Sequence, residues 1–401
     1  MGDCRGVGGV EGDGGMRYLF VPLGGLVTIL GGGTPSRKND AYWGGSIPWA
    51  TVKDLKGTSL SGTQETITPE GLRDSASNLI PAGSVIVATR MGLGKVAINT
   101  IDVTINQDLK AFLCSADIEP RYLLYFLLVN ASHLDSMGKG ATVKGITLDV
   151  LKDLLVPLPP LPEQKRIAAI LDKADSIRRK RQEAVRQTEE LLRSAFLEMF
   201  GDQAENPKGW EVVKLKKCCK RITDGTHQPP GFTNVGVPFL FVSNVINGQL
   251  DFTSTKFISH DTFQELNRRC PVEIGDVLYT TVGSYGNAAI VETGRPFSFQ
   301  RHIAHIKPDN NKVVEKYLVA TMQSPMVKKQ ADMQARGVAQ KTLNLSELKD
   351  FEIYLPPRKI QQQFVEQRER ILKITRHYQD CLYQTDTLFN SLLQRAFMGE
   401  L

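Results

Sequence analysis

Residues 139–160 read KGATVKGITLDVLKDLLVPLPP, and residues 336–357 read RGVAQKTLNLSELKDFEIYLPP. The two stretches align without a gap, both end in Leu-Pro-Pro, and a long charged segment follows each of them. Similarity of this kind within one chain indicates a duplicated architecture, in which each copy is one structural unit. We therefore expect the two copies to have the same fold.

The similarity extends outward from these stretches in both directions. IPAGSVIVATRMGLGKVAI at 80–98 matches VEIGDVLYTTVGSYGNAAI at 272–290, again without a gap, and LLRSAFLEMF at 191–200 matches LLQRAFMGEL at 392–401. The chain is thus predicted to be two tandem copies of one unit. The expected divisions are a disordered N-terminal extension 1–16, a first globular domain 17–157, a long helix 158–200, a linker 201–211, a second globular domain 212–354 and a long helix 355–401.

Each copy contains signals for both strands and helices. GSVIVAT at 83–89 and GDVLYTT at 275–281 are short β-branched runs after a glycine turn, and a second glycine turn leads into a hairpin partner. Residues 120–130 and 315–324 have the pattern of short helices with buried faces. The predicted fold class is α+β, with two tandem α+β domains, each followed by a long helix.

The two long segments carry apolar residues at steps of three and four, which predicts a helix with one apolar seam. About 36 residues in such a helix span roughly 54 Å. We expect the two helices to pair as an antiparallel coiled coil; the alternative is that each packs on its own globule. The predicted seam residues are Ile167, Ile170, Ile177, Leu191, Phe364, Ile371, Ile374, Leu388 and Leu392.

The totals of the 401-residue chain describe an ordinary globular protein, with 41% hydrophobic and 23% charged residues. The net charge of +6 is compatible with nucleic-acid binding but does not require it. The six cysteines form no CxxC pair, and no apolar run is long enough to span a bilayer. These features favour a cytoplasmic protein without a membrane partner.

Two similar globules joined by long paired helices suit a ligand with a repeating period, and duplex DNA has a period of about 34–36 Å. The loops of each copy are rich in side chains that donate to bases and phosphates. The alternative for any one of these loops is an ordinary solvated surface. The candidates for DNA binding in the first copy are Arg37, Lys38, Asn39, Tyr42, Arg90, Lys95, Gln107, Lys110, Lys139 and Lys144. The candidates in the second copy are His227, Gln228, Tyr285, Asn287, Gln300, Arg301, His302, Arg336, Gln340 and Lys341.

Motifs for catalysis fail when they are tested against the sequence. GLGK at 92–95 is followed by Val96 and lacks the first glycine of a phosphate-binding loop, and no GxGxxG opens a helix. His302 and His305 lie in a strand-like run without other metal ligands, which favours a structural or DNA-facing role. No catalytic residues, metal ligands or cofactor site are predicted. The basic run 178–181 is interpreted as a solvated helix face, and the alternative that it contacts DNA stays open.

The duplication, the Leu-Pro-Pro openings and the helix EQKRIAAILDKAD at 163–175 together resemble the DNA-specificity subunit of type I restriction–modification systems. The resemblance covers residues 17–401. It implies that each globule reads one half of a bipartite, asymmetric site in double-stranded DNA. It also implies that the helices set the gap and dock two modification subunits, which methylate adenine with S-adenosyl-methionine. Restriction subunits using ATP and Mg²⁺ complete the complex, so the cofactors belong to the partners.

Two other functions stay open at the level of the sequence. One is a non-catalytic scaffold whose globules bind peptides, and the other is a stand-alone DNA-modifying enzyme. Binding to duplex DNA that weakens steeply with salt separates the first alternative from the leading interpretation. Catalytic inactivity of the purified chain separates the second.

Overall fold

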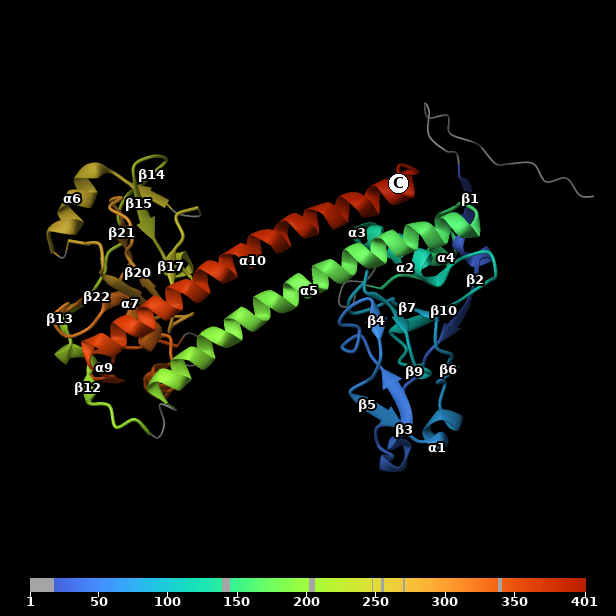
Figure 1. Ribbon diagram of the computed structural model, residues 1–401, viewed down its shortest axis with the longest axis horizontal. Helices are drawn as coiled ribbons and strands as arrows, with labels where there is room; N and C mark the ends of the chain where they lie inside the picture. Colours follow the sequence, from blue (N-terminus) through green and yellow to red (C-terminus); the bar gives the residue numbers. More distant parts are fainter. Residues whose placement is uncertain are drawn as a thin grey trace, which may run out of the picture. The chain divides into compact units, whose positions relative to one another are not determined.

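The structure is a computed structural model that describes residues 18–138, 145–201, 206–246, 248–253, 256–269, 271–337 and 341–401. It divides into two compact units. The first unit contains the described residues up to Glu183 together with Gln379–Leu401, and the second contains Ala184–Tyr378. Both divisions fall inside long helices, so each unit consists of one α+β globule and a part of each long helix (Figure 1).

The globule of the first unit is built on two sheets and one ribbon. The five-stranded sheet has the order β2 (Val27–Gly31), β10 (Leu109–Cys114), β7 (Val85–Ala88), β8 (Val96–Asn99) and β4 (Ser59–Leu60). The four-stranded sheet has the order β5 (Glu65–Ile67), β3 (Trp43–Ala50), β9 (Val103–Ile105) and β6 (Leu79–Ile80). The ribbon pairs β1 (Leu19–Pro22) with β11 (Leu155–Leu158). Its helices are α1 (Pro69–Arg73), α2 (Pro120–Val129), α3 (Ala131–Met137) and α4 (Leu148–Lys152).

The globule of the second unit repeats much of this plan. One four-stranded sheet has the order β13 (Cys219–Asp224), β22 (Ile303–Pro308), β19 (Val277–Thr280) and β20 (Ala288–Ile290). The other has the order β14 (Phe232–Thr233), β18 (Lys256–Ile258), β15 (Val237–Leu240) and β21 (Ser298–Phe299). Two ribbons pair β12 (Val212–Lys214) with β23 (Glu352–Tyr354) and β16 (Val245–Ile246) with β17 (Gln249–Leu250). Its helices are α6 (His260–Arg269), α7 (Glu315–Met322), α8 (Pro325–Gln334) and α9 (Leu345–Lys349).

The α+β fold class and its duplication are confirmed. The glycine-flanked runs form antiparallel hairpins in both copies, β7 with β8 and β19 with β20. The two short helices form as α2 and α7, and their apolar faces enter the cores. The expected extension 1–16 lies outside the described residues.

The Leu-Pro-Pro motif lies directly before each long helix, α5 (Leu161–Phe200) and α10 (Arg358–Met398). The carbonyl of the second proline, Pro160 or Pro357, accepts the first amides of the helix. The carbonyl of the first proline, Pro159 or Pro356, accepts a hydrogen bond from a buried glutamine side chain one turn into the helix. Proline suits these positions because it has no N–H that needs a partner.

That glutamine fastens each long helix to its globule. Gln164 donates to the carbonyl of Asp117 at 2.9 Å and accepts from the amide of Glu119 at 2.9 Å. Gln361 makes the same pair of bonds with Lys312 and Val314 of the second copy, at 3.2 and 2.8 Å. Both side chains are buried, so these bonds satisfy amide groups that water does not reach.

The two long helices contact one another within each unit. In the first unit, Arg181 of α5 donates to the carbonyl of Cys381 of α10 at 2.6 Å, and Arg178 lies 4.9 Å from the ring of Phe389. Residue numbers fall on α5 as they rise on α10, so the pairing there is antiparallel. In the second unit, Phe196 and Phe200 of α5 pack on Phe364 of α10.

The predicted seam is only partly correct. Ile167, Phe364 and Ile371 are buried, and Ile170 and Leu392 are half-buried. The prediction is wrong for the other four positions, because Ile177, Leu191, Ile374 and Leu388 are between 43% and 59% exposed.

The reason is that the helices pack on the globules as well as on each other. Phe389, Leu393 and Ala396 of α10 share one hydrophobic cluster with Ile167 of α5 and the core of the first globule. Packing against a globule does not impose the strict seven-residue repeat of a coiled coil, and a straight helix drifts from that repeat by about 20° per heptad. The buried stripe near the end of α10 accordingly begins at Phe389 and not at Leu388.

Candidate nucleic-acid interface

Three loops of the first globule meet at the end of strand β7. The amide of Thr89 donates to the carbonyl of Asp108 at 2.8 Å, and the carbonyl of Thr89 accepts from the amide of Ile146 at 3.0 Å. These bonds bring together the β7–β8 turn, the loop before β10 and the segment before α4. We call this arrangement the three-loop cluster of the first unit.

The second globule makes the same backbone connections with different side chains. The amide of Thr281 donates to the carbonyl of His302 at 2.9 Å, and the amide of Leu343 donates to the carbonyl of Thr281 at 2.8 Å. The β19–β20 turn, the loop before β22 and the segment before α9 therefore form a second three-loop cluster. The backbone scaffold is repeated, whereas its polar side chains differ between the copies.

The first cluster concentrates positive charge. Lys110 is half-buried and its Nζ donates to the carbonyl of Gln107 at 3.2 Å. Burial lowers the pKa of Lys110, and the neighbouring charge of Arg90 lowers it further. Arg90 is exposed and has no ion pair with any residue that the structure describes. An anion bound here relieves the repulsion between the two cations, because an opposite charge favours the charged form of lysine.

Several other candidates of the first copy already have partners within the first globule. Arg37 forms a bidentate ion pair with Glu65 at 2.5 and 2.8 Å and lies 3.7 Å from the ring centroid of Trp43. The hydrogen bond to Glu65 raises the pKa of Arg37. The side chain of Asn39 caps the short helix that follows it, and the hydroxyl of Tyr42 donates to Asp74 at 3.3 Å. Lys38 is exposed, and no ion pair or hydrogen bond joins its side chain to the described residues. Lys95 is also exposed, and its Nζ lies 3.5 Å from the carbonyl of Val52.

The candidates of the second copy border the second cluster. The side chain of Arg301 donates from Nε to His302 at 3.3 Å, and its backbone amide donates to the carbonyl of Thr226 at 3.0 Å. His227 pairs with Asp224 at 3.0 Å in the same neighbouring loop. Of the remaining candidates at this border, Gln228 and Lys341 are exposed and Gln300 is half-buried.

An ion pair and a hydrogen-bonded tyrosine flank the β19–β20 turn. The hydroxyl of Tyr285 donates to Asp332 of α8 at 2.6 Å, and Lys328 of α8 lies 4.1 Å from the same tyrosine ring. Asn287 donates to the carbonyl of Ser284 within the turn, at 2.9 Å. Arg336 pairs with Glu347 at 3.2 Å. Lys139, Lys144 and Gln340 lie outside the described residues.

The two histidines of the predicted His-x-x-His pair have separate surroundings. His305 is buried and its Nε2 lies 2.6 Å from Oδ2 of Asp276, which also accepts from Lys307 at 2.9 Å. Burial acts to raise the pKa of Asp276, but the hydrogen bonds from His305, the amide of Glu273 and Lys307 outweigh it, so the pKa is lowered. Among the described residues no group of three side chains is placed to hold a metal ion.

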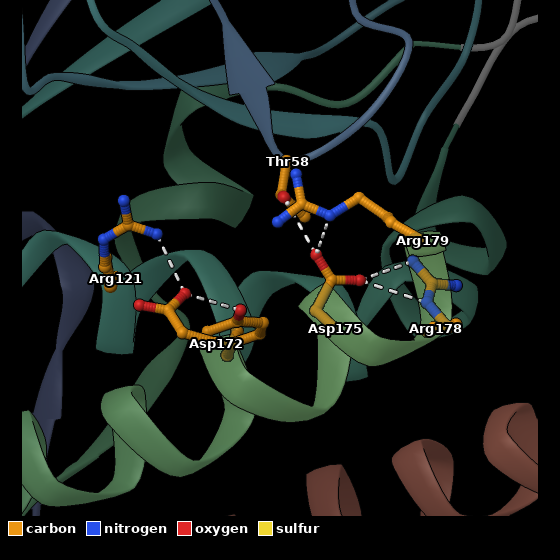
Figure 2. A network of polar contacts seen from close by, with 7 residues as sticks. Thr58, Arg121, Asp172, Asp175, Arg178 and Arg179 are labelled. Atoms are coloured by element: carbon orange, nitrogen blue, oxygen red, sulfur yellow. Dashed lines mark hydrogen bonds and ion pairs between the residues drawn. The ribbon is translucent and has the colours of Figure 1, made fainter. Parts of the chain in front are cut away.

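The basic run 178–181 is a solvated helix face only in part, because Arg179 and Lys180 are exposed whereas Arg178 and Arg181 are half-buried. Arg178 and Arg179 pair with buried Asp175 at 2.8 and 3.1 Å (Figure 2). Arg181 donates to the carbonyl of Cys381 in helix α10. The network in Figure 2 was not found from the sequence. One ion pair of this network, Arg121–Asp172 at 2.8 Å, has an equivalent in the second copy, Lys316–Glu369 at 3.0 Å. The recurrence of opposite charges at matching positions of the two copies is a signal that the sequence contains.

None of the described helices is both long and apolar enough to cross a membrane. The candidate DNA contacts remain predictions, and only some of them, Arg90 and Lys110 among them, lie on or directly beside the loops of the two three-loop clusters.

Comparison with known proteins gives matches over nearly the whole chain. The family model described as the type I restriction modification DNA specificity domain matches residues 18–187 and again residues 207–377. The MjaIX type I restriction enzyme specificity subunit of Methanocaldococcus jannaschii is 24% identical over 396 residues, covering 93% of this chain and 91% of that protein. The EcoR124I/EcoR124II specificity subunit of Escherichia coli is 35% identical over 162 residues, covering 39% of this chain and 40% of that one.

One solved structure resembles the whole chain in its fold. It is the S subunit of a type I restriction-modification system from M. genitalium, with a TM-score of 0.58, 14% sequence identity, and coverage of 97% of this chain and 98% of that one. At this level of identity the likeness concerns the fold alone.

Proposed function

This chain belongs to the family of type I restriction–modification DNA specificity subunits, and on that premise we propose that each of its globules reads one half of a bipartite, asymmetric site in double-stranded DNA. The subunit is not itself catalytic and binds no cofactor. S-adenosyl-methionine and ATP are used by the modification and restriction subunits of such systems. The relative from M. jannaschii, which matches over 91% of its own length, is named a specificity subunit.

The observation that carries the proposal is the repeated three-loop cluster. The same backbone bonds hold three loops together at Thr89 and at Thr281, while the polar side chains on those loops differ. Phosphate contacts orient a protein on DNA, and side-chain contacts to base edges choose the sequence. A common scaffold with different side chains therefore suits two half-sites of different sequence, read by equivalent surfaces.

We assign the phosphate contacts of the first half-site to Arg90 and Lys110, and base contacts to the polar side chains around them. The cation pair supports this assignment, because burial and the charge of Arg90 lower the pKa of Lys110 and a phosphate reverses that effect. In the second half-site we assign the corresponding role to Arg301 and Lys341, which border the equivalent cluster.

The paired helices are proposed to set the gap between the half-sites and to dock two modification subunits, one for each copy. The four predicted seam residues that are exposed support docking, since Ile177, Leu191, Ile374 and Leu388 present apolar surface. Restriction subunits, which also require Mg²⁺, then complete the assembly. We place this complex in the cytoplasm, with the DNA that it reads.

Mapping of methylated bases tests the proposal. The chain is expressed with its cognate modification subunit, and adenine methylation is read from the cellular DNA by long-read sequencing. We expect one split, asymmetric motif with a fixed gap. Replacing residues 212–354 by the same region of a relative must change one half of the motif and leave the other half intact. Methylation at a continuous or palindromic site, or a swap that alters both halves, contradicts independent reading.

A further inference from the structure

Asp175 of helix α5 is a buried carboxylate with an unusually complete set of partners. Its side chain has no exposed surface. Oδ1 accepts from Nε and Nη2 of Arg178 at 3.0 and 2.8 Å, and Oδ2 pairs with Nε of Arg179 at 3.1 Å. Both arginines lie one turn beyond Asp175 on the same helix, and their pairing alone explains how the charge is tolerated without water.

A third partner of Asp175, after the two arginines, comes from the globule. The hydroxyl of Thr58, 117 residues earlier in the chain, donates to Oδ2 of Asp175 at 3.1 Å (Figure 2). Thr58 directly precedes β4, the edge strand beside β8, and its carbonyl accepts from the amide of Ile98 in β8 at 3.0 Å. Strand β8 forms the hairpin whose turn carries Arg90 and Lys95. The Thr58–Asp175 hydrogen bond thus joins helix α5 to the start of β4, and β4 pairs with β8, the strand that follows the turn of the first three-loop cluster.

Asp175 also faces the second helix of the pair through its partner. The guanidinium of Arg178 lies 4.9 Å from the ring of Phe389 of α10, which is part of the core of the first unit. The carboxylate therefore lies where the edge of the sheet and both long helices come together. A hydrogen bond at such a place is directional, unlike apolar packing, and favours one angle between sheet and helix.

The second copy lacks this contact, although the surrounding scaffold is the same. Gly248 occupies the place of Thr58, and its carbonyl accepts from the amide of Ile290 at 3.3 Å, as Thr58 does from Ile98. Leu372 occupies the place of Asp175, 197 positions later, at the same offset as the buried Gln164 and Gln361. Neither Gly248 nor Leu372 has a polar side chain, so the Thr58–Asp175 bond is a feature of the first copy and not a requirement of the fold.

We propose that the Thr58–Asp175 hydrogen bond is a positioning contact that fixes the angle of the first recognition globule on helix α5, and that it thereby narrows the range of gap lengths which the subunit accepts. This inference rests on the proposed reading of a bipartite site. Thr58 and Asp175 themselves contact no DNA in this scheme; they act through β4, β8 and the hairpin turn.

The test uses the full complex of this chain with its modification subunits. Thr58→Val removes the hydroxyl and keeps the branched shape, so the ion pairs of Asp175 stay in place. Thr58→Ser restores the donor. Thr63→Val is the matched control, because among the described residues the hydroxyl of Thr63 donates to the carbonyl of Glu65, two residues later at the start of β5, at 2.7 Å. Methylation is measured on duplexes that keep both half-sites and carry the native gap or a gap longer or shorter by one base pair.

We expect the ratio of methylation at the native gap to methylation at a shifted gap to fall about three- to tenfold in Thr58→Val, the loss that corresponds to one hydrogen bond. Thr58→Ser and Thr63→Val must keep the wild-type ratio. An unchanged ratio in Thr58→Val overturns the inference, and so does an equal loss of methylation at all three gaps.

Asp175→Leu provides a second route if Thr58→Val does not assemble, and it places in the first copy the residue type that Leu372 provides in the second. Leucine offers no acceptor to the Thr58 hydroxyl, so the ratio must fall again, and an unchanged ratio refutes the inference. A wild-type complex that shows no preference for any gap contradicts the proposed function itself. A wild-type preference that survives both substitutions contradicts only the positioning role.

Discussion

Substitution of Gln164 by alanine is expected to destabilise the first unit by about 3 to 5 kcal/mol. Three hydrogen bonds are lost, each of them 2.9 Å long: two donated to the carbonyls of Asp117 and Pro159, and one accepted from the amide of Glu119. The glutamine side chain is 1% exposed, so water does not replace it at these groups. A buried group without a partner costs about 1 to 3 kcal/mol, and the vacated volume adds to that cost.

Hydrogen exchange of the full chain, read by mass spectrometry, measures this loss separately in each unit. Amides of α2 must exchange faster in Gln164→Ala, while amides of α7 keep their protection. Gln361→Ala must give the mirror result, because it loses equivalent bonds at 2.8, 3.2 and 2.8 Å. The losses must add in the double variant, since the two sites share no partner.

Gln362→Ala is the matched control, because this neighbouring glutamine is exposed and its truncation must leave exchange unchanged. A loss below about 1 kcal/mol in Gln164→Ala refutes the reasoning, as that is the contribution of a single solvent-compensated hydrogen bond. Equal loss of protection in both units refutes it as well, because the bonds described here fasten each helix only to its own globule.

Three other outcomes are expected. Arg90→Ala must weaken binding to duplex DNA, and the slope of log affinity against log salt concentration must become shallower by about one. Arg37→Ala must change this slope less, because the charge of Arg37 is already paired with Glu65. Equal slopes in the two variants contradict the assignment of a phosphate contact to Arg90. The pKa of Asp276 is lowered in the folded chain, so the ionised carboxylate stabilises the fold above the unfolded pKa of about 4, and this stabilisation is lost as the pH falls through the folded pKa. Asp276→Asn must therefore be less stable at neutral pH, and its stability must decline less steeply as the pH falls. An unchanged decline in acid contradicts this role of Asp276. Leu388→Arg must reduce the amount of modification subunit that co-purifies with this chain, without unfolding the chain. Gln384→Arg, on the same exposed surface, must leave that amount unchanged. If Leu388→Arg retains the full amount of modification subunit, docking at Leu388 is contradicted.

The duplication could be recognised from the sequence, because its recognition requires only a comparison of residues that lie a nearly constant number of positions apart. The hairpins at 85–99 and 277–290 were readable because glycine turns and β-branched runs act over a few residues. The Leu-Pro-Pro openings were readable for the same reason, since a proline marks the first turn of a helix whatever lies around it. The polar loops were identified as a class, but the sequence did not separate Arg90, which lacks an ion pair among the described residues, from Arg37, which is held by Glu65.

The sequence by itself thus determined the two-copy plan, one hairpin and one short helix of each copy, and the approximate positions where the long helices begin. Only the tertiary structure decided which face of each long helix is buried. Steps of three and four allow two neighbouring stripes on α10, one through Leu388 and one through Phe389, and the core of the first globule selects the second. It also decided that Asp175 meets Thr58 across 117 residues. Such choices depend on atoms brought together from distant parts of the chain, and no local pattern of residues contains them.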